Sequence, residues 1–171
     1  LFTRVKAVYD QKDNLKLTPE QSRLLTETYK QFIRGGANLP VDKKEELKKV
    51  NEQLSVLDIK FDKNLLAETN GFKLVIDNKE DLAGLPEAVV EGAAAEAKAD
   101  GKDGKWVFTL QKPSWIPFLT YSDRRELREK LYKAMYNRCD NDNENDNKAI
   151  INQYINLRLK KANLMGYDSW A

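Results

Sequence analysis

The sequence predicts a mainly α-helical fold, in which several helices pack around one long helix and a small two-stranded β ribbon is inserted between them. Three observations support this class. An apolar stripe with helical spacing runs through residues 42–70. Helix-starting and helix-stopping residues bracket the other amphipathic stretches. Only two short segments, 72–76 and 106–110, are rich in the β-branched and aromatic residues that strands favour.

The long helix is predicted from apolar residues that recur in alternating steps of three and four positions, namely Leu47, Val50, Leu54, Leu57 and Phe61. Asp42 stands where an N-cap is expected, and Gly71 is expected to end the helix after Asn70 in the left-handed conformation. A coiled coil is the alternative, but the stripe holds fewer than about four clean heptads. We therefore expect this helix to be the support against which the other helices pack.

Two helices are expected before the long one, so that residues 1–70 form a part of the chain made of helices and the breaks between them. The first covers about residues 2–12. The second has Thr18 as its N-cap, Pro19 at its first position and Gln21 completing a capping box. Gly35 and Gly36 are expected to stop it.

Residues 71–112 are predicted to form a strand–helix–strand insert. Its helix begins at Pro86 and continues to about Asp100, between the two strands. A two-stranded ribbon alone is marginally stable in water. We therefore expect helices or further sequence to cover it.

Residues 113–171 are predicted to form a helical pair. Because prolines stand at positions 113 and 117, the segment 113–119 is predicted to be neither helix nor central strand. Ser122 is the predicted N-cap of the next helix. A last helix is expected over about residues 147–165, and its apolar residues cover so wide an arc that we expect it to be buried on two sides.

Composition excludes several classes of function. The chain has 29 basic and 27 acidic residues in an interleaved pattern, which is not typical of nucleic-acid or membrane-surface binding. The single cysteine, Cys139, allows no internal disulfide and is expected to be a small buried group. Histidine is absent, which excludes Ser-His-Asp triads, Cys-His pairs and His-based zinc sites within this chain.

The acidic run Asp140–Asp146 superficially resembles a calcium-binding loop. An EF-hand loop requires Gly at its sixth position and Glu at its twelfth, where this sequence has Asn145 and Ile151. We therefore predict a solvated interhelical loop with a capping Asp or Asn.

Two further groups of residues, one of arginines and one of aromatic residues, are candidate binding sites. The first could bind a phosphate or carboxylate but is expected to pair with nearby acidic residues; it consists of Arg124, Arg125 and Arg128. The second could form a peptide-binding wall but is expected to pack in the interior; it consists of Trp106, Trp115, Trp170, Phe118 and Tyr121. Ser114 and Ser122 lack a nearby base. The sequence therefore assigns no catalytic, cofactor-binding or metal-binding residue.

Several stretches together resemble a known family, and they occur in the same order over nearly the whole chain: Leu1–Lys6, Leu24–Tyr29, Phe32–Ala37, Asp81–Pro86, Lys105–Leu110, Pro113–Ser114, Pro117–Ser122, Arg125–Tyr132 and Leu157–Tyr167. The chain resembles the thimet-oligopeptidase-like zinc metallopeptidases, and among them the bacterial peptidyl-dipeptidases. The resemblance implies a larger two-lobed helical enzyme that hydrolyses short peptides and releases C-terminal dipeptides. It also implies zinc held by a His-Glu-x-x-His helix and a further Glu.

That zinc motif is missing from this sequence, so no site residue carries over from the family. We therefore expect an N-terminal-side fragment that is itself inactive, with the catalytic lobe of its own longer chain as its partner. We expect a cytoplasmic protein, with an exported one left open because the chain begins without Met. The alternatives are a stand-alone helical interaction module and an enzyme that works through carboxylates. An excised segment should also expose apolar surface on its last helix and its ribbon, or hide that surface by self-association.

Overall fold

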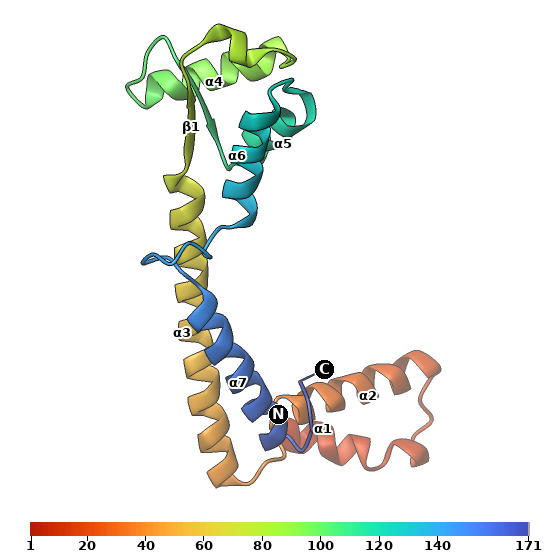
Figure 1. The fold of residues 1–171 in the computed structure, drawn as a ribbon. Coiled ribbons are helices and arrows are strands. Elements are labelled where there is room, and N and C mark those ends of the chain that lie inside the picture. The colour runs from red at the N-terminus through yellow and green to blue at the C-terminus, as the bar shows by residue number, and fades with distance from the viewer. Residues whose placement is uncertain (171) are drawn as a thin grey trace. The chain divides into compact units, whose positions relative to one another are not determined.

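The computed structural model describes residues 1–170; Ala171, the last residue of the predicted C-terminal part, lies outside the described residues. Within 1–170 the chain forms seven α-helices, two short 3₁₀ helices and one two-stranded sheet (Figure 1). The predicted fold class, mainly helical with a small two-stranded ribbon, is therefore confirmed.

The elements follow one another in an order close to the predicted one. The helices are α1 (Phe2–Tyr9), α2 (Pro19–Arg34), α3 (Val41–Gly71), α4 (Glu87–Ala99), α5 (Lys112–Tyr121), α6 (Arg125–Tyr136) and α7 (Lys148–Leu164). The strands are β1 (Lys73–Ile76) and β2 (Trp106–Thr109). The contacts divide the chain into two compact units, which we describe separately: the first unit contains residues 1–57 and those from 152 onward, and the second contains residues 58–151.

In the first unit, α1 and α2 pack against each other through aromatic rings. The rings of Tyr9 and Tyr29 stack with their centroids 3.9 Å apart. The predicted capping box is present, because Thr18 Oγ1 accepts the Gln21 backbone N–H and Gln21 Oε1 accepts the Thr18 backbone N–H. The α1–α2 pair nevertheless contains no fully buried side chain.

The first half of α3 supplies most of the buried side chains of this unit. The predicted stripe is confirmed there, since four of its members are buried: Leu47, Val50, Leu54 and Leu57. The C-terminal part of α7 packs alongside, where Lys160 Nζ pairs with Glu46 at 2.8 Å and Lys161 Nζ donates to Asn51 Oδ1 at 2.8 Å.

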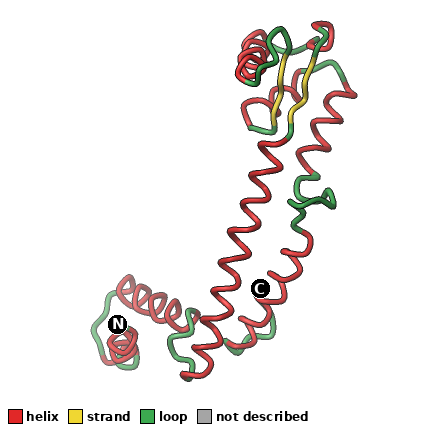
Figure 2. Tube along the Cα trace, turned by 90° about the vertical axis from the view of Figure 1, so that its left-hand side faces the viewer, coloured by secondary structure: helices red, strands yellow, loops and turns green. Residues whose placement is uncertain are grey.

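The second unit is built on the antiparallel ribbon, shown as yellow strands in Figure 2, with Leu74 opposite Phe108 and Ile76 opposite Trp106. These residues join Phe118 of α5 and Leu131 of α6 in one apolar core. The apolar side chains of the ribbon are thus covered by helices of the same unit. Our expectation that the ribbon exposes apolar surface was wrong.

The segment 113–119 was predicted to be non-helical, and this was wrong, because it lies inside α5. Pro113 stands in the first turn, where no intrahelical N–H is needed. Pro117 removes one hydrogen bond from the helix interior. Burial of Phe118 in the apolar core compensates for the lost hydrogen bond. A prediction from the positions of the prolines alone does not include this stabilisation by distant residues.

Three predicted caps were also wrong. Asp42 lies within the first turn of α3, which begins at Val41. Asn70 is helical and is absent from the residues with positive φ. Ser122 is the C-cap of α5, and α6 begins three residues later, although Ser122 Oγ still accepts the Arg124 backbone N–H at 3.2 Å. Local capping rules located each boundary only to within a few residues.

The last helix is not buried on two sides. Ile150 and Ala162 are buried, whereas Ile155 and Leu159 are 58% and 44% exposed. The expected exposure of apolar surface on this helix is therefore present. No helix among the described residues is long and apolar enough to cross a membrane.

Candidate functional site

A hollow of the second unit lies where the end of α3, the ribbon, α4 and the start of α5 meet. It has a volume of about 630 Å³ and is lined by both apolar and polar residues, including Asn70, Lys73, Glu96 and Ser114. The Lys73 ammonium is held by Asp100, which lies outside the lining. Asn70 Oδ1 accepts from Gln111 Nε2 at 3.0 Å. This wall offers hydrogen-bonding groups but no pairing of a nucleophile with a base.

Ser114 and Ser122, the two serines considered above as nucleophiles, both form hydrogen bonds that stabilise the fold. Ser114 Oγ accepts the Thr109 backbone N–H at 2.9 Å and thereby joins the end of β2 to α5. Ser122 is buried and accepts through its Oγ from Arg124 N–H and through its carbonyl from Arg128. A hydroxyl without a base to remove its proton remains a weak nucleophile.

The arginine cluster is divided among different partners. Arg124 Nε pairs with Asp81 Oδ1 at 2.9 Å, which is a carboxylate outside its own helix. Arg128 donates to the Ser122 carbonyl. Arg125 and Arg128 line a separate shallow hollow together with Glu129. The expected pairing with an acidic residue is therefore confirmed for Arg124. The three guanidinium groups do not converge on one anion.

The tryptophans are also separated. Trp106 and Trp115 pack against the apolar core, and Phe118 is fully buried in it. The indole Nε1 of Trp115 is buried without a hydrogen-bond partner. Trp170 belongs to the first unit and is half exposed. Interior packing is therefore confirmed for Trp106, Trp115 and Phe118, while Tyr121 and Trp170 remain at the surface.

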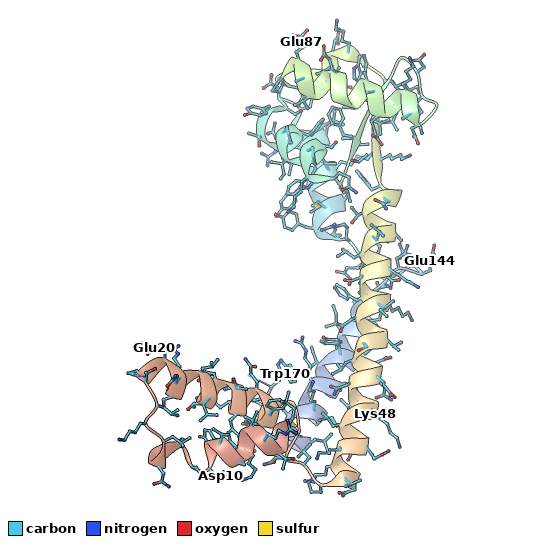
Figure 3. The ribbon with its side chains drawn as sticks, turned by 180° about the vertical axis from the view of Figure 1, so that it is seen from behind. Asp10, Glu20, Lys48, Glu87, Glu144 and Trp170 are labelled. Atoms are coloured by element: carbon cyan, nitrogen blue, oxygen red, sulfur yellow. The ribbon has the colours of Figure 1, made fainter. Side chains whose placement is uncertain are left out.

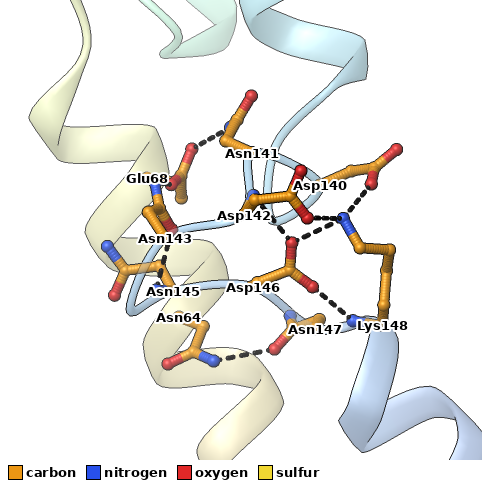
Figure 4. Close-up of polar contacts among 10 residues, drawn as sticks. All are labelled: Asn64, Glu68, Asp140, Asn141, Asp142, Asn143, Asn145, Asp146, Asn147 and Lys148. Atoms are coloured by element: carbon orange, nitrogen blue, oxygen red, sulfur yellow. Dashed lines mark hydrogen bonds and ion pairs between the residues drawn. The ribbon is translucent and has the colours of Figure 1, made fainter.

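The acidic run 140–146 forms a closed turn around a lysine that sequence analysis did not single out (Figure 4). The ammonium of Lys148 lies 2.6 Å from Asp140, 2.9 Å from Asp142 and 2.7 Å from Asp146. These carboxylates, the hydrogen bond to Asp140 first, raise the pKa of Lys148. The three carboxylates are thus neutralised in part by the ammonium of a side chain from the same chain. The only hint of this arrangement in the sequence is that Lys148 follows Asp146, the last acidic residue of the run, by two positions.

Asp146 also supplies the predicted cap. Its carboxylate accepts the Lys148 backbone N–H at 2.9 Å and the Asp142 backbone N–H at 3.0 Å. Hydrogen bonds from the Lys148 side chain, the largest cause, and from these two amides hold the pKa of Asp146 below its usual value. The prediction of an interhelical loop with a capping Asp is confirmed.

The same loop is joined to α3 by several polar contacts (Figure 4). Asn147 is 2% exposed, and its amide accepts from Asn64 Nδ2 at 2.8 Å and donates to the Phe61 carbonyl at 3.2 Å. The two oxygens of Glu68 accept from Asn141 and Asn143 at 2.8 and 2.6 Å. Cys139 is buried nearby in the loop, as predicted, and burial raises the pKa of its thiol. We call the contacts made by Asn147 and Glu68 with their partners the polar cluster. Both buried amides in it, those of Asn64 and Asn147, have hydrogen-bond partners.

No group of three or more His, Cys, Asp or Glu side chains among the described residues is arranged to hold a metal ion. The whole sequence contains no histidine. A zinc ion bound by imidazole does not fit these residues.

The geometry of these residues does not indicate a function, but comparison with known proteins shows which proteins the chain is similar to. Residues 118–171 match the model of peptidase family M3. The whole chain is 33% identical, over 177 aligned positions, to a probable cytosolic oligopeptidase A of Arabidopsis thaliana. It is equally similar to the dipeptidyl carboxypeptidase of Escherichia coli, at 33% over 171 positions, and 91% of it is 30% identical to the oligopeptidase A of E. coli.

The relatives are peptidases. All of this chain is covered by the first two comparisons, yet it spans only about a quarter of the length of those relatives, 25% in each case. The equal identities do not separate the dipeptidyl carboxypeptidase from the oligopeptidase, so the peptidyl-dipeptidase assignment is not supported over the broader one.

Proposed function

We propose that this chain is a scaffold segment of a longer zinc metallopeptidase of family M3, and that it forms part of the wall of the channel in which short peptides are hydrolysed. Release of C-terminal dipeptides is the specificity that we propose for that enzyme. The observation that carries the proposal is similarity to peptidases along the entire chain, over a quarter of their length.

The zinc of this proposal belongs elsewhere in the longer protein. The chain has no imidazole, and the three carboxylates that converge in the second unit already surround the ammonium of Lys148. When bound elsewhere, zinc would activate water for attack on the peptide bond. The residues of this chain would position the channel wall and would hold no catalytic group, so we propose that the chain alone is inactive.

Exposed apolar side chains support the existence of a partner surface. Residues 118–171, the part matched by the family, contain eight of the seventeen exposed large apolar side chains among the described residues. Ile155 and Leu159 lie one helical turn apart on α7, and adjacent exposed apolar side chains of this kind can mark an interaction site. We propose that the catalytic lobe of the same longer chain covers it.

A stand-alone helical interaction module is the second candidate, because the second unit has a closed apolar core of its own. The two proposals differ in the sequence that follows residue 171. A His-Glu-x-x-His motif in the same reading frame is expected for the peptidase, and a reading frame without one would overturn it.

Cleavage specificity is tested separately. The longest natural form of the protein should cleave a short peptide with a free C-terminus and lose activity when that terminus is amidated, if it releases dipeptides. Equal cleavage of both peptides would contradict dipeptide release and leave an oligopeptidase. We also propose a cytoplasmic location, which cell fractionation tests; the name of one Arabidopsis relative describes that protein as cytosolic.

A further inference from the structure

A small pocket in the first unit lies between the end of α2 and the last part of α7. Its volume is about 360 Å³, and its walls include Arg34, Lys161, Met165, Tyr167 and Trp170. The labelled side chain of Trp170 is seen beside the end of α7 in Figure 3. The pocket therefore combines two cationic side chains with an apolar and aromatic wall.

The positive charge of this pocket has no acidic partner among the described residues. No carboxylate of the described residues lines it, and neither Arg34 nor Lys161 forms an ion pair with any of those residues. Lys161 Nζ donates to the neutral amide of Asn51 at 2.8 Å. Lys160, the adjacent residue on α7, pairs with Glu46 at 2.8 Å. Asp168 is close in sequence but neither lines the pocket nor forms an ion pair with its cations.

A third cation holds the aromatic wall in place. The Arg158 guanidinium lies 4.4 Å from the centroid of the Tyr154 ring and 5.0 Å from that of Trp170. Lys161 Nζ lies 5.6 Å from the same Trp170 ring. Cation–π attraction of this kind favours the observed orientation of the exposed ring. Arg158 is thus a positioning residue for Trp170.

We propose that this pocket binds a carboxylate group of a peptide, with the side chain next to that carboxylate packed on Trp170 and Met165. Arg34 and Lys161 supply charged donors to the two carboxylate oxygens. The apolar wall would be unused by inorganic phosphate, and a volume of about 360 Å³ is large enough for a peptide carboxylate with the side chain beside it. The inference rests on this geometry alone and stands or fails separately from the proposed peptidase function.

Three N-acetylated dipeptides test it on residues 1–171 at constant ionic strength. The probes are acetyl-Ala-Leu with a free C-terminus, acetyl-Ala-Glu-amide and acetyl-Ala-Leu-amide. The indole N–H signal of Trp170 is followed by NMR, with those of Trp106 and Trp115 as internal references. We expect saturable shifts of Trp170 with one or both carboxylate probes, at a dissociation constant of about 1 mM or lower, and none with the neutral amide.

The two carboxylate probes distinguish a C-terminal carboxylate from a Glu side chain. The proposal is overturned if neither shifts Trp170, if the neutral amide shifts it equally, or if inorganic phosphate binds as tightly as the better carboxylate probe.

Substitutions locate the binding to this pocket. Arg34→Gln should weaken binding by about 10-fold, because it removes a charged donor that has no described partner to lose. Lys161→Gln should have a similar effect, and Lys160→Gln, with its charge one residue away, is the matched control and should change binding less than about 2-fold. Equal weakening by Lys160→Gln and Lys161→Gln would show a general charge effect and overturn the assignment. Melting temperatures of the variants confirm that each is folded.

Discussion

The two compact units of this chain bury their side chains to different degrees. The second unit has one continuous apolar core, in which Phe118 and Leu131 are completely buried by the ribbon and its helices. In the first unit, α1 and α2 contain no buried side chain, and burial is concentrated in one stripe of α3. We infer that the second unit is stable by itself, whereas the first would gain most from additional protein packed on it. The predictions below test this difference.

The largest effect is expected from truncating the two cores. Phe118→Ala in the second unit should lower the free energy of unfolding by about 3–5 kcal/mol, because it leaves a cavity in a closed core. Phe32→Ala in the first unit removes a half-buried ring and should cost roughly 1–2 kcal/mol. Urea denaturation followed by circular dichroism measures both. Equal losses would contradict the difference between the units.

Two glycines with positive φ offer the next comparison. A Cβ at Gly84 would lie 2.3 Å from the backbone carbonyl of Tyr121, whereas one at Gly36 would lie 2.3 Å from the side-chain Cδ2 of Leu47. A side chain can move more easily than a backbone, so Gly84→Ala should cost about 2–4 kcal/mol and Gly36→Ala about half as much. Both include the strain of a left-handed residue.

Gly92→Ala is the control for this pair. It lies within α4 with open space around it and should stabilise the protein by about 0.5–1 kcal/mol. Thermal denaturation ranks the three variants, and a larger loss for Gly36→Ala than for Gly84→Ala would contradict the packing described here.

The polar cluster of the second unit can be compared with a more exposed polar contact of the first unit, the hydrogen bond from Lys161 to Asn51. Asn147→Ala removes the partner of Asn64 and of the Phe61 carbonyl at a buried position, so it should cost about 1–3 kcal/mol. Asn51→Ala removes only a half-exposed contact with Lys161 and should cost about 0.5 kcal/mol. Asn145→Ala, whose side-chain amide has no described partner, serves as the control. Chemical denaturation at neutral pH compares them.

The smallest effect concerns pH. The pKa of Asp146 is lowered in the folded protein, so its contribution is present above the unfolded value of about 3.9 and is lost as pH falls through the folded value. Lys148→Met removes the main cause of that shift. The melting temperature of the variant should therefore fall less between pH 6 and pH 3 than that of the parent protein. Lys160→Met, which breaks one exposed ion pair, should leave the acid sensitivity unchanged.

Sequence patterns predicted the elements well where a feature is local or periodic. The α3 stripe and the Thr18 capping box depend on spacing alone, and both are present. The helical state of 113–119 could not be predicted this way, because it depends on the burial of Phe118 in a core made by distant residues.

The sites show the same limit. An acidic loop was recognised at 140–146, but its internal cation, Lys148, is identified only by geometry. The pocket at Trp170 joins Arg34 to Lys161, which lie far apart in the sequence, so no motif could indicate it. The peptidase relationship came from the collinear resemblance, and composition alone showed only that imidazole chemistry is excluded from this chain.

The most direct test of the account compares peptide hydrolysis by residues 1–171 with hydrolysis by the longest natural form of the protein, both with added zinc. A short fluorogenic peptide is the substrate, and a chelator is added as the control. We predict chelator-sensitive turnover by the longer form and none by residues 1–171. Zinc-dependent turnover by residues 1–171 would contradict the proposal that this chain alone is inactive, and absence of turnover by the longer form would contradict the proposal that it is a peptidase.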